Sequence, residues 1–136
     1  MLAGLINFMD KTNFKGNREK SIVLKKAFEF GVKTIHICEK LDADKHYILS
    51  RQLIRSGTSI GANLNEALGG YSKKEFIYKM MLSLKEAQET EYWLKLIQAA
   101  KISSQLNYDQ LIDDAIEIQR ILTTIIKTAR VNQPQN

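Results

Sequence analysis

Few residues in this chain of 136 have the types and spacing that catalysis or metal binding requires. The two histidines, His36 and His46, belong neither to an HExxH motif nor to the ExxH pairs of ferritin-like di-metal bundles. Cys38 has no second cysteine with which to form a redox pair or a zinc cluster, and its place near the inward stripe of a predicted helix indicates a buried, inert thiol. We therefore expect no catalytic residue, no metal site and no cofactor, and the sequence predicts a protein that is not an enzyme.

Nearby carboxylates and glycines do not change this expectation. Glu86, Glu89 and Glu91 point in different directions around a helix, which favours surface charges over a set of metal ligands. Gly57 and Gly61 lie inside a predicted helix, whereas a phosphate-binding loop places its glycines between a strand and a helix. The sequence therefore predicts no nucleotide-binding loop.

Positive charge is the feature that points most clearly to a ligand. The chain has 20 Lys and Arg against 15 Asp and Glu, and most of the excess lies in its first half. Five basic residues share one side of the first predicted helix: Arg18, Lys25, Lys26, Lys33 and Lys40. Such a stripe attracts phosphates, yet a lysine-rich face without an arginine cluster or interleaved aromatic residues is also an ordinary solvated surface. Binding of RNA or DNA through this stripe is the hypothesis carried forward.

The elements that position these residues are helical. One Pro and seven Gly leave little sequence for the frequent turns of a β-sandwich or barrel. Apolar residues recur at spacings of three and four in four segments, which predicts four amphipathic helices. Short links between long helices favour an all-α fold, an antiparallel up-down-up-down four-helix bundle over residues 18–131. Residues 1–17 are predicted as an irregular N-terminal arm and residues 132–136 as a polar tail.

Capping residues set the predicted helix boundaries. The second helix reaches Gly69–Gly70, where a left-handed C-terminal cap is expected. Ser72 and Glu75 form a capping box at the start of the third helix, which continues to about Ser103 and is the longest. A similar cap at 107–110 opens the fourth helix.

Two of the predicted helices carry more apolar surface than one buried stripe needs. The side of the third helix that faces away from the core holds Tyr78, Leu82, Trp93, Leu96 and Ile97. The apolar face of the first helix is widened by Leu24, Phe28 and Ile35. A wide helix that sits deeper in the bundle is one explanation. We favour self-association, because exposed aromatic patches mark protein contacts. The oligomer interface then contains Tyr78, Leu82, Trp93 and Leu96.

The second predicted helix combines glycines with a polar stripe. Gly57 and Gly61 lie one turn apart, and each costs about 1 kcal/mol relative to Ala in a helix interior, which predicts a close helix crossing. The polar stripe consists of Gln52, Arg55, Ser59, Asn63 and Glu66. It is either a solvated face or a buried or inter-subunit hydrogen-bond ladder. Glu91 falls on the inward arc of the third helix, and Arg55 is a candidate partner for it.

The middle of the chain contains several short strings in a fixed order. They are Arg55-Ser56-Gly57-Thr58-Ser59-Ile60-Gly61-Ala62-Asn63, Glu66-Ala67, Ser72-Lys73-Lys74-Glu75-Phe76, Leu84-Lys85-Glu86-Ala87-Gln88-Glu89-Thr90 and Tyr92-Trp93-Leu94. Over about residues 45–100 they resemble the four-helix-bundle family named after the 23S rRNA intervening-sequence protein. That family is related to the accessory variability determinant of diversity-generating retroelements, a homopentameric bundle that binds nucleic acid and a reverse transcriptase.

The resemblance implies a cyclic homo-oligomer of about five subunits, a nucleic-acid ligand and a protein partner such as a reverse transcriptase. It carries over no catalytic residue, because no residue of the matching strings has an assigned catalytic or binding role. A scaffold that binds only protein is the alternative function. No apolar run approaches the roughly 20 residues of a membrane span, and the N-terminal stretch lacks a signal peptide's basic start and cleavage site. We therefore expect a cytoplasmic protein that does not contact membranes.

Overall fold

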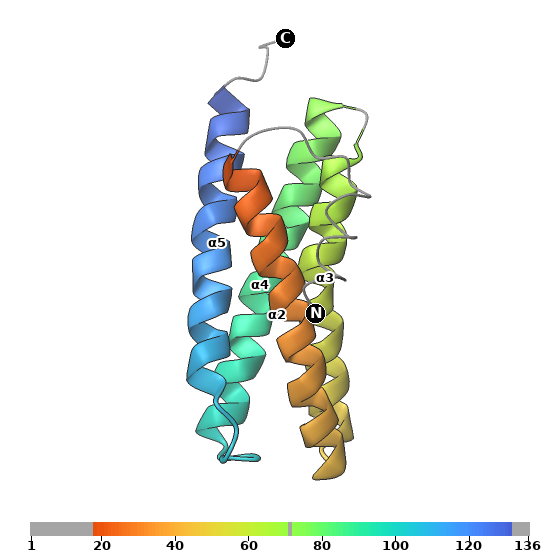
Figure 1. Cartoon of the computed structure of the whole chain (residues 1–136), viewed down its shortest axis with the longest axis vertical. Helices are drawn as coiled ribbons and strands as arrows, with labels where there is room; N and C mark the ends of the chain where they lie inside the picture. Colours follow the sequence, from red (N-terminus) through yellow and green to blue (C-terminus); the bar gives the residue numbers. More distant parts are fainter. Residues whose placement is uncertain (1–17, 71, 132–136) are drawn as a thin grey trace.

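The computed structural model describes residues 18–70 and 72–131, and these residues form four helices. The helices are α2 (Arg18–Ala43), α3 (Tyr47–Leu68), α4 (Lys73–Ala99) and α5 (Tyr108–Val131). Each helix packs against its neighbours in the chain, and α2 also packs against α5, which closes the bundle. Figure 1 shows that α2 and α4 begin at the end of the bundle where α3 and α5 finish. The predicted antiparallel four-helix bundle is confirmed, whereas the predicted arm (1–17) and tail (132–136) lie outside the described residues.

Apolar side chains at helical spacing fill the space between the helices. Each helix contributes a large side chain that is almost fully buried: Phe30, Leu53, Met80 and Leu122. Burying a side chain of this size stabilises the fold by roughly 1.5–3 kcal/mol. The apolar stripe predicted for the last helix, from Leu111 to Ala129, is buried throughout. No helix in the described part of the chain is long and apolar enough to cross a membrane.

The buried face of α4 differs from the prediction. Ile97, which the sequence placed on the outer side, is fully buried. Phe76 and Leu84, which were expected inside, are only half-buried against the core. The other four positions predicted to face inward are buried: Ile77, Met80, Ala87 and Leu94. Two polar residues complete the buried face, and a count of apolar residues alone does not recognise them.

These two polar positions are Ser83 and Thr90, and both make hydrogen bonds across the interface with α3. Ser83 Oγ donates to the carbonyl oxygen of Ile60 at 2.8 Å. Thr90 Oγ1 lies 2.9 Å from Ser56 Oγ. Because buried hydroxyls are tolerated when they are hydrogen-bonded, small polar residues here let α3 and α4 approach without an unpaired group.

The helix boundaries confirm the N-terminal caps and correct the C-terminal ones. Ser72 Oγ accepts the N–H of Glu75 at 3.0 Å, and Asn107 Oδ1 accepts the N–H of Gln110 at 3.3 Å. The left-handed cap expected at Gly69–Gly70 is wrong: Gly69 has φ −94°, and its N–H closes a right-handed turn onto Glu66 O.

α4 is also shorter than predicted. It ends at Ala99 rather than near Ser103, although it remains the longest of the four described helices. Lys101 (φ 58°) and Ser103 (φ 46°) adopt left-handed conformations, which interrupt the helix although no glycine or proline marks the site.

One of the two glycines of α3 explains how closely α2 and α3 pack. A Cβ at Gly57 would lie 2.7 Å from Thr34 Cγ2 and 2.9 Å from Thr34 Oγ1, which is too close for any side chain. At Gly61 a Cβ would only reach ordinary contact, 3.7 Å from Ala27 O. The predicted close crossing is therefore confirmed, and of the two glycines only Gly57 lies where a Cβ would clash.

Candidate nucleic-acid interface

The basic stripe predicted on α2 is divided by the position of α5. Lys26 Nζ lies 2.7 Å from Glu117 Oε1, and Lys33 Nζ lies 3.1 Å from Asp114 Oδ2. The hydrogen bond with Glu117 raises the pKa of Lys26 above its usual value. These two lysines therefore belong to the α2–α5 interface, although 38% and 42% of their side-chain surfaces stay exposed.

The rest of the stripe faces solvent. Arg18, Lys25 and Lys40 are exposed, and within the described residues none of them has a carboxylate at ion-pair distance. Arg18 and Lys25 lie on the side of α2 opposite its buried residues, and Lys40 lies seven residues after Lys33, near the end of the helix. These three cations can meet a phosphate without giving up a partner inside the bundle.

A second group of cations lies at the end of the bundle where α2 and α4 begin, here called the basic end (Figure 1). Its members are Arg18, Lys20, Lys73, Lys74, Lys127 and Arg130. The carboxylates at the same end are Glu19, Glu66 and Glu75, of which Glu66 is held by Lys79 at 2.6 Å. Sequence reasoning missed the basic end because no single helix terminus contributes more than two of its cations. The antiparallel order of the helices is the signal that could have found it.

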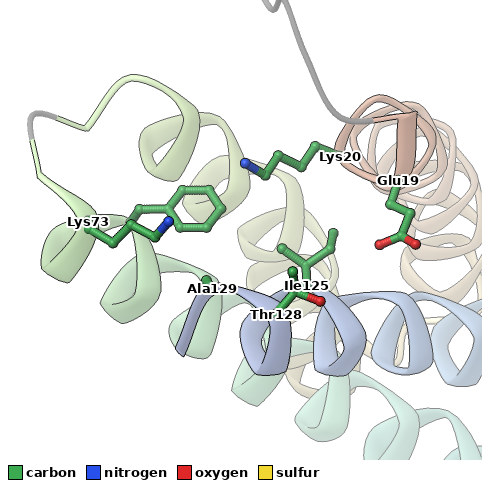
Figure 2. A pocket seen from close by; sticks show the side chains of 7 residues that line it. Glu19, Lys20, Lys73, Ile125, Thr128 and Ala129 are labelled. Carbon is green, nitrogen blue, oxygen red and sulfur yellow. The ribbon is translucent and has the colours of Figure 1, made fainter. Parts of the chain in front are cut away.

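A cavity of about 200 Å³ opens in the basic end (Figure 2). It is lined by Glu19, Lys20, Lys73, Phe76, Ile125, Thr128 and Ala129. Lys20 Nζ sits 4.7 Å from the centre of the Phe76 ring, a cation–π contact. Figure 2 shows Lys20 and Lys73 reaching into the cavity from opposite sides, whereas the carboxylate of Glu19 points away from both.

The polar stripe of α3 runs along the edge that α3 shares with α4. Arg55 donates from Nη1 to Glu86 Oε2 at 3.3 Å and from Nη2 to Glu89 Oε2. The other members of the stripe are half-buried or exposed: Gln52, Ser59, Asn63 and Glu66. The stripe is thus a partly solvated edge with ion pairs between helices. It is neither fully solvated nor a buried ladder.

The carboxylate of Glu91 has partners other than the expected Arg55. Glu91 Oε2 lies 2.6 Å from Lys95 Nζ, and Glu91 Oε1 accepts a hydrogen bond from Gln119 Nε2 at 2.7 Å. These hydrogen bonds lower the pKa of Glu91. The predicted Arg55–Glu91 pair is wrong because Glu91 lies on the side of α4 that faces α5, whereas Arg55 approaches from α3.

The outer side of α4 presents aromatic and aliphatic surface to solvent. Tyr78 and Leu96, both predicted at an oligomer interface, are 58% and 42% exposed. Leu82 and Trp93 are half-buried, and Trp93 Nε1 donates to Glu89 Oε2 at 3.3 Å. Two further exposed residues that the sequence analysis did not single out are Met81 and Tyr92.

A shallow apolar groove of about 300 Å³ lies between α2 and α3. Phe28 and Ile35 line it together with Gly31 and Gly61. A Cβ at Gly31 would meet nothing within 4 Å. Of the three residues predicted to widen the apolar face of the first helix, Phe28 and Ile35 therefore face this groove, whereas Leu24 is fully buried in the core.

The single thiol is sealed between α2 and α3. Cys38 is 2% exposed, its Sγ donates to Ser50 O at 3.4 Å, and Ser50 Oγ donates to Cys38 O at 3.2 Å. Burial raises the pKa of the Cys38 thiol to about 11. The prediction that this thiol is buried is confirmed. Within residues 18–70 and 72–131, no three His, Cys, Asp or Glu side chains lie where they could hold a metal ion.

The fold and surfaces define an all-α bundle whose marked features are charged and apolar patches. The sequence model of the 23S rRNA-intervening sequence protein family matches residues 19–124, so the chain belongs to that family. It is also similar to a protein of unknown function from the S23 ribosomal protein family of Bacteroides thetaiotaomicron VPI-5482, known from a crystal structure. The two are 37% identical, with a TM-score of 0.75 over 80% of this chain and 98% of the other. A search of curated proteins found no match.

Proposed function

We propose that this chain is a non-enzymatic, cytoplasmic accessory protein that binds nucleic acid, with RNA as the favoured ligand. The observation that carries the proposal is the set of three exposed cations on α2, Arg18, Lys25 and Lys40, none of which has a carboxylate partner among the described residues. Exposed cations without partners attract phosphates, because no internal ion pair has to be broken when they bind.

Assembly makes such a surface effective. Three contacts from one subunit bind a polyanion weakly, whereas a ring of about five subunits repeats them along one nucleic acid. Linked contacts multiply affinity through effective concentration, without any new chemistry. The proposed function therefore depends on a cyclic homo-oligomer.

Self-association is supported by apolar surface that the four described helices do not cover among themselves. The outer side of α4, with Tyr78, Tyr92 and Leu96, is one such surface, and the groove between α2 and α3 is another. They lie on different sides of the bundle, so a contact between them joins unlike surfaces of two subunits. Contacts of this head-to-tail kind close into rings when the rotation between subunits allows it.

A scaffold that binds only protein, with a reverse transcriptase as one kind of partner, is the second candidate. The exposed Tyr78 and Tyr92 favour it, because tyrosine is enriched at protein interfaces. Such a scaffold would have no affinity for RNA, and its partner contacts would depend little on salt.

Charge reversal at the three cations tests the proposal. Arg18→Glu, Lys25→Glu and Lys40→Glu together should weaken binding of a fluorescent RNA at 50 mM salt at least tenfold, measured by anisotropy. Lys26 and Lys33 stay unchanged, because reversing them would place two carboxylates against Glu117 and Asp114.

The matched control reverses three exposed cations elsewhere, Lys85, Lys101 and Arg120, so that both variants have the same net charge. It should bind RNA within about threefold of the parent. Light scattering on all three proteins should give the same mass, near five subunits. Equal loss of RNA binding in both variants would contradict the role of the three cations on α2. A monomeric parent that binds RNA tightly would contradict the dependence on a ring.

A further inference from the structure

We infer that the cavity in the basic end is a phosphate subsite, in which Lys20 and Lys73 hold one phosphate of a nucleic-acid backbone between them. The inference rests on the proposed function. It assigns one phosphate to a defined cavity, whereas the stripe on α2 is an open surface. Figure 2 shows the two side chains entering the cavity from opposite sides, one from the first turn of α2 and one from the first turn of α4.

The shape of the cavity suits a phosphate. Its volume of about 200 Å³ leaves room for a tetrahedral anion, and both Lys20 and Lys73 line it. Thr128, on the last turns of α5, brings a hydroxyl to the same cavity as a further hydrogen-bond donor. Three helices that are distant in sequence thus contribute donors to one site.

One of the two cations is held in position before a ligand arrives. Lys20 Nζ lies 4.7 Å from the centre of the Phe76 ring, and the cation–π contact restricts an otherwise mobile side chain. A side chain that is already restricted loses less conformational entropy when it binds. Lys73 is exposed and reaches the cavity from the other side. Lys20 and Lys73 together are called the clamp.

The surroundings favour a polymer over a single small anion. Four further cations lie at the same end of the bundle: Arg18, Lys74, Lys127 and Arg130. The opposite end of the bundle has no such excess, since Asp42, Asp44 and Asp109 accompany Lys40, Lys45 and Lys101 there. Adjacent phosphates of one strand can therefore be neutralised at the basic end, whereas an isolated phosphate uses only the clamp.

Among the described residues, Glu19 is the one carboxylate that lines the cavity. Its charge opposes an anion, even though it points away from Lys20 and Lys73 in Figure 2.

The main test reverses the clamp in the full chain. Lys20→Glu with Lys73→Glu should bind a fluorescent 20-nucleotide single-stranded RNA at least tenfold more weakly than the parent. Its plot of log affinity against log salt should be shallower by about 1.4, which corresponds to two lost contacts to single-stranded phosphates. The control pair Lys85→Glu and Arg120→Glu, with the same net charge, should stay within threefold and keep the slope of the parent.

Two further variants separate the loss of a charge from the loss of the fold. Lys20→Arg with Lys73→Arg keeps both cations and should retain RNA binding within threefold. If Lys20→Glu lowers the melting temperature, the single variant Lys73→Glu decides, because its side chain is exposed. If the Lys20→Glu, Lys73→Glu variant binds RNA with the affinity and the salt slope of the control pair, the cavity is not a phosphate subsite. The proposed nucleic-acid function is unaffected by that result.

The subsite is also tested without RNA. In an amide NMR titration with inorganic phosphate, the signals of Lys20, Lys73 and Thr128 should shift in the parent and stay still in the Lys20→Glu, Lys73→Glu variant. A mononucleotide should produce shifts similar to those of phosphate, and the oligonucleotide should bind at least tenfold more tightly than either. Equal affinity for mononucleotide and oligonucleotide would reassign the cavity to free nucleotides and overturn the backbone assignment. Shifts without RNA binding by the parent would contradict the proposed function alone.

Discussion

α2 packs against α3 on one side and against α5 on the other, and the two interfaces are made of different kinds of contact. Toward α3 the helices touch through small residues, with Gly57 beneath Thr34 and the Cys38 thiol against Ser50. Toward α5 the main polar contacts are two half-exposed ion pairs next to a cavity of about 130 Å³.

The difference shows which side of α2 fixes the fold and which side can respond to a ligand. A contact through glycine depends on shape, so one added atom has nowhere to go. A half-exposed ion pair contributes at most about 1 kcal/mol and is screened by salt, so its lysine can exchange the carboxylate for a phosphate at little cost. The α3 side of α2 therefore determines stability. The lysines on the α5 side are available to a ligand, as are the solvent-facing cations of α2.

The largest effect is expected from a bulky residue at the glycine contact. Gly57→Leu should lower the free energy of unfolding by about 3 kcal/mol or more, because its side chain would overlap Thr34. Thr58→Leu, one residue further on and facing the apolar groove, should cost under about 1 kcal/mol. Urea unfolding of the two variants measures the difference, and equal midpoints would show that the glycine has no packing role.

The same contact can be dissected with a smaller pair of changes. Gly57→Ala alone should be destabilising, and Thr34→Ala in the same chain should recover part of the loss, because only a Cβ at about 3.2 Å then remains in the way. If the changes in the free energy of unfolding caused by Gly57→Ala and Thr34→Ala simply add, the strain does not come from contact between these two residues.

Alkaline pH should weaken the α3 side through Cys38. Its pKa is about 11 in the fold against 9.0 for an ordinary thiol, so between these values the folded chain keeps a proton that the unfolded chain has lost. Stability should therefore fall as pH rises from about 9 to 11, by roughly 2 to 3 kcal/mol in total. Urea unfolding at pH 8 and pH 10.5 should show this loss in the parent. The loss should be smaller in Cys38→Ala, and identical pH dependence in both would contradict the assignment.

The second glycine sharpens the comparison, since it lies one turn from the first and a Cβ there would make only ordinary van der Waals contacts. Gly61→Ala should raise the stability by about 0.5 to 1 kcal/mol, because alanine favours the helix and its Cβ meets Ala27 only at ordinary contact distances. A destabilised variant would mean that the groove is closed in the assembled protein, and light scattering on the variant would then detect a lower mass.

Sequence periodicity predicted the four helices and their antiparallel order because each helix buries an apolar stripe of regular spacing. It could not separate Gly57 from Gly61, since both residues look alike until the position of Thr34 is known. Likewise, the lysine stripe was visible in the sequence, but the pairing of Lys26 and Lys33 depends on where α5 packs. The spacing of residues along the sequence thus identifies the faces of each helix. It does not identify which helix packs against each face, because that depends on the folded bundle.

The smallest change in stability is expected on the α5 side of α2. Asp114→Asn with Glu117→Gln should change the free energy of unfolding by less than about 1 kcal/mol, because both ion pairs are partly solvated. The same variant releases Lys26 and Lys33 and should bind RNA two- to tenfold more tightly. Unchanged RNA affinity would mean that these lysines lie away from the nucleic acid.

The salt dependence of RNA binding by the unaltered chain tests the central claim most directly. Cations that meet phosphates release condensed counterions, so log affinity should fall linearly with log salt. With contacts from Arg18, Lys25, Lys40, Lys20 and Lys73, at about 0.7 per contact to a single strand, the slope should be about −3 or steeper. A slope near zero, or no binding at 50 mM salt, would contradict the nucleic-acid assignment and leave the protein-binding scaffold.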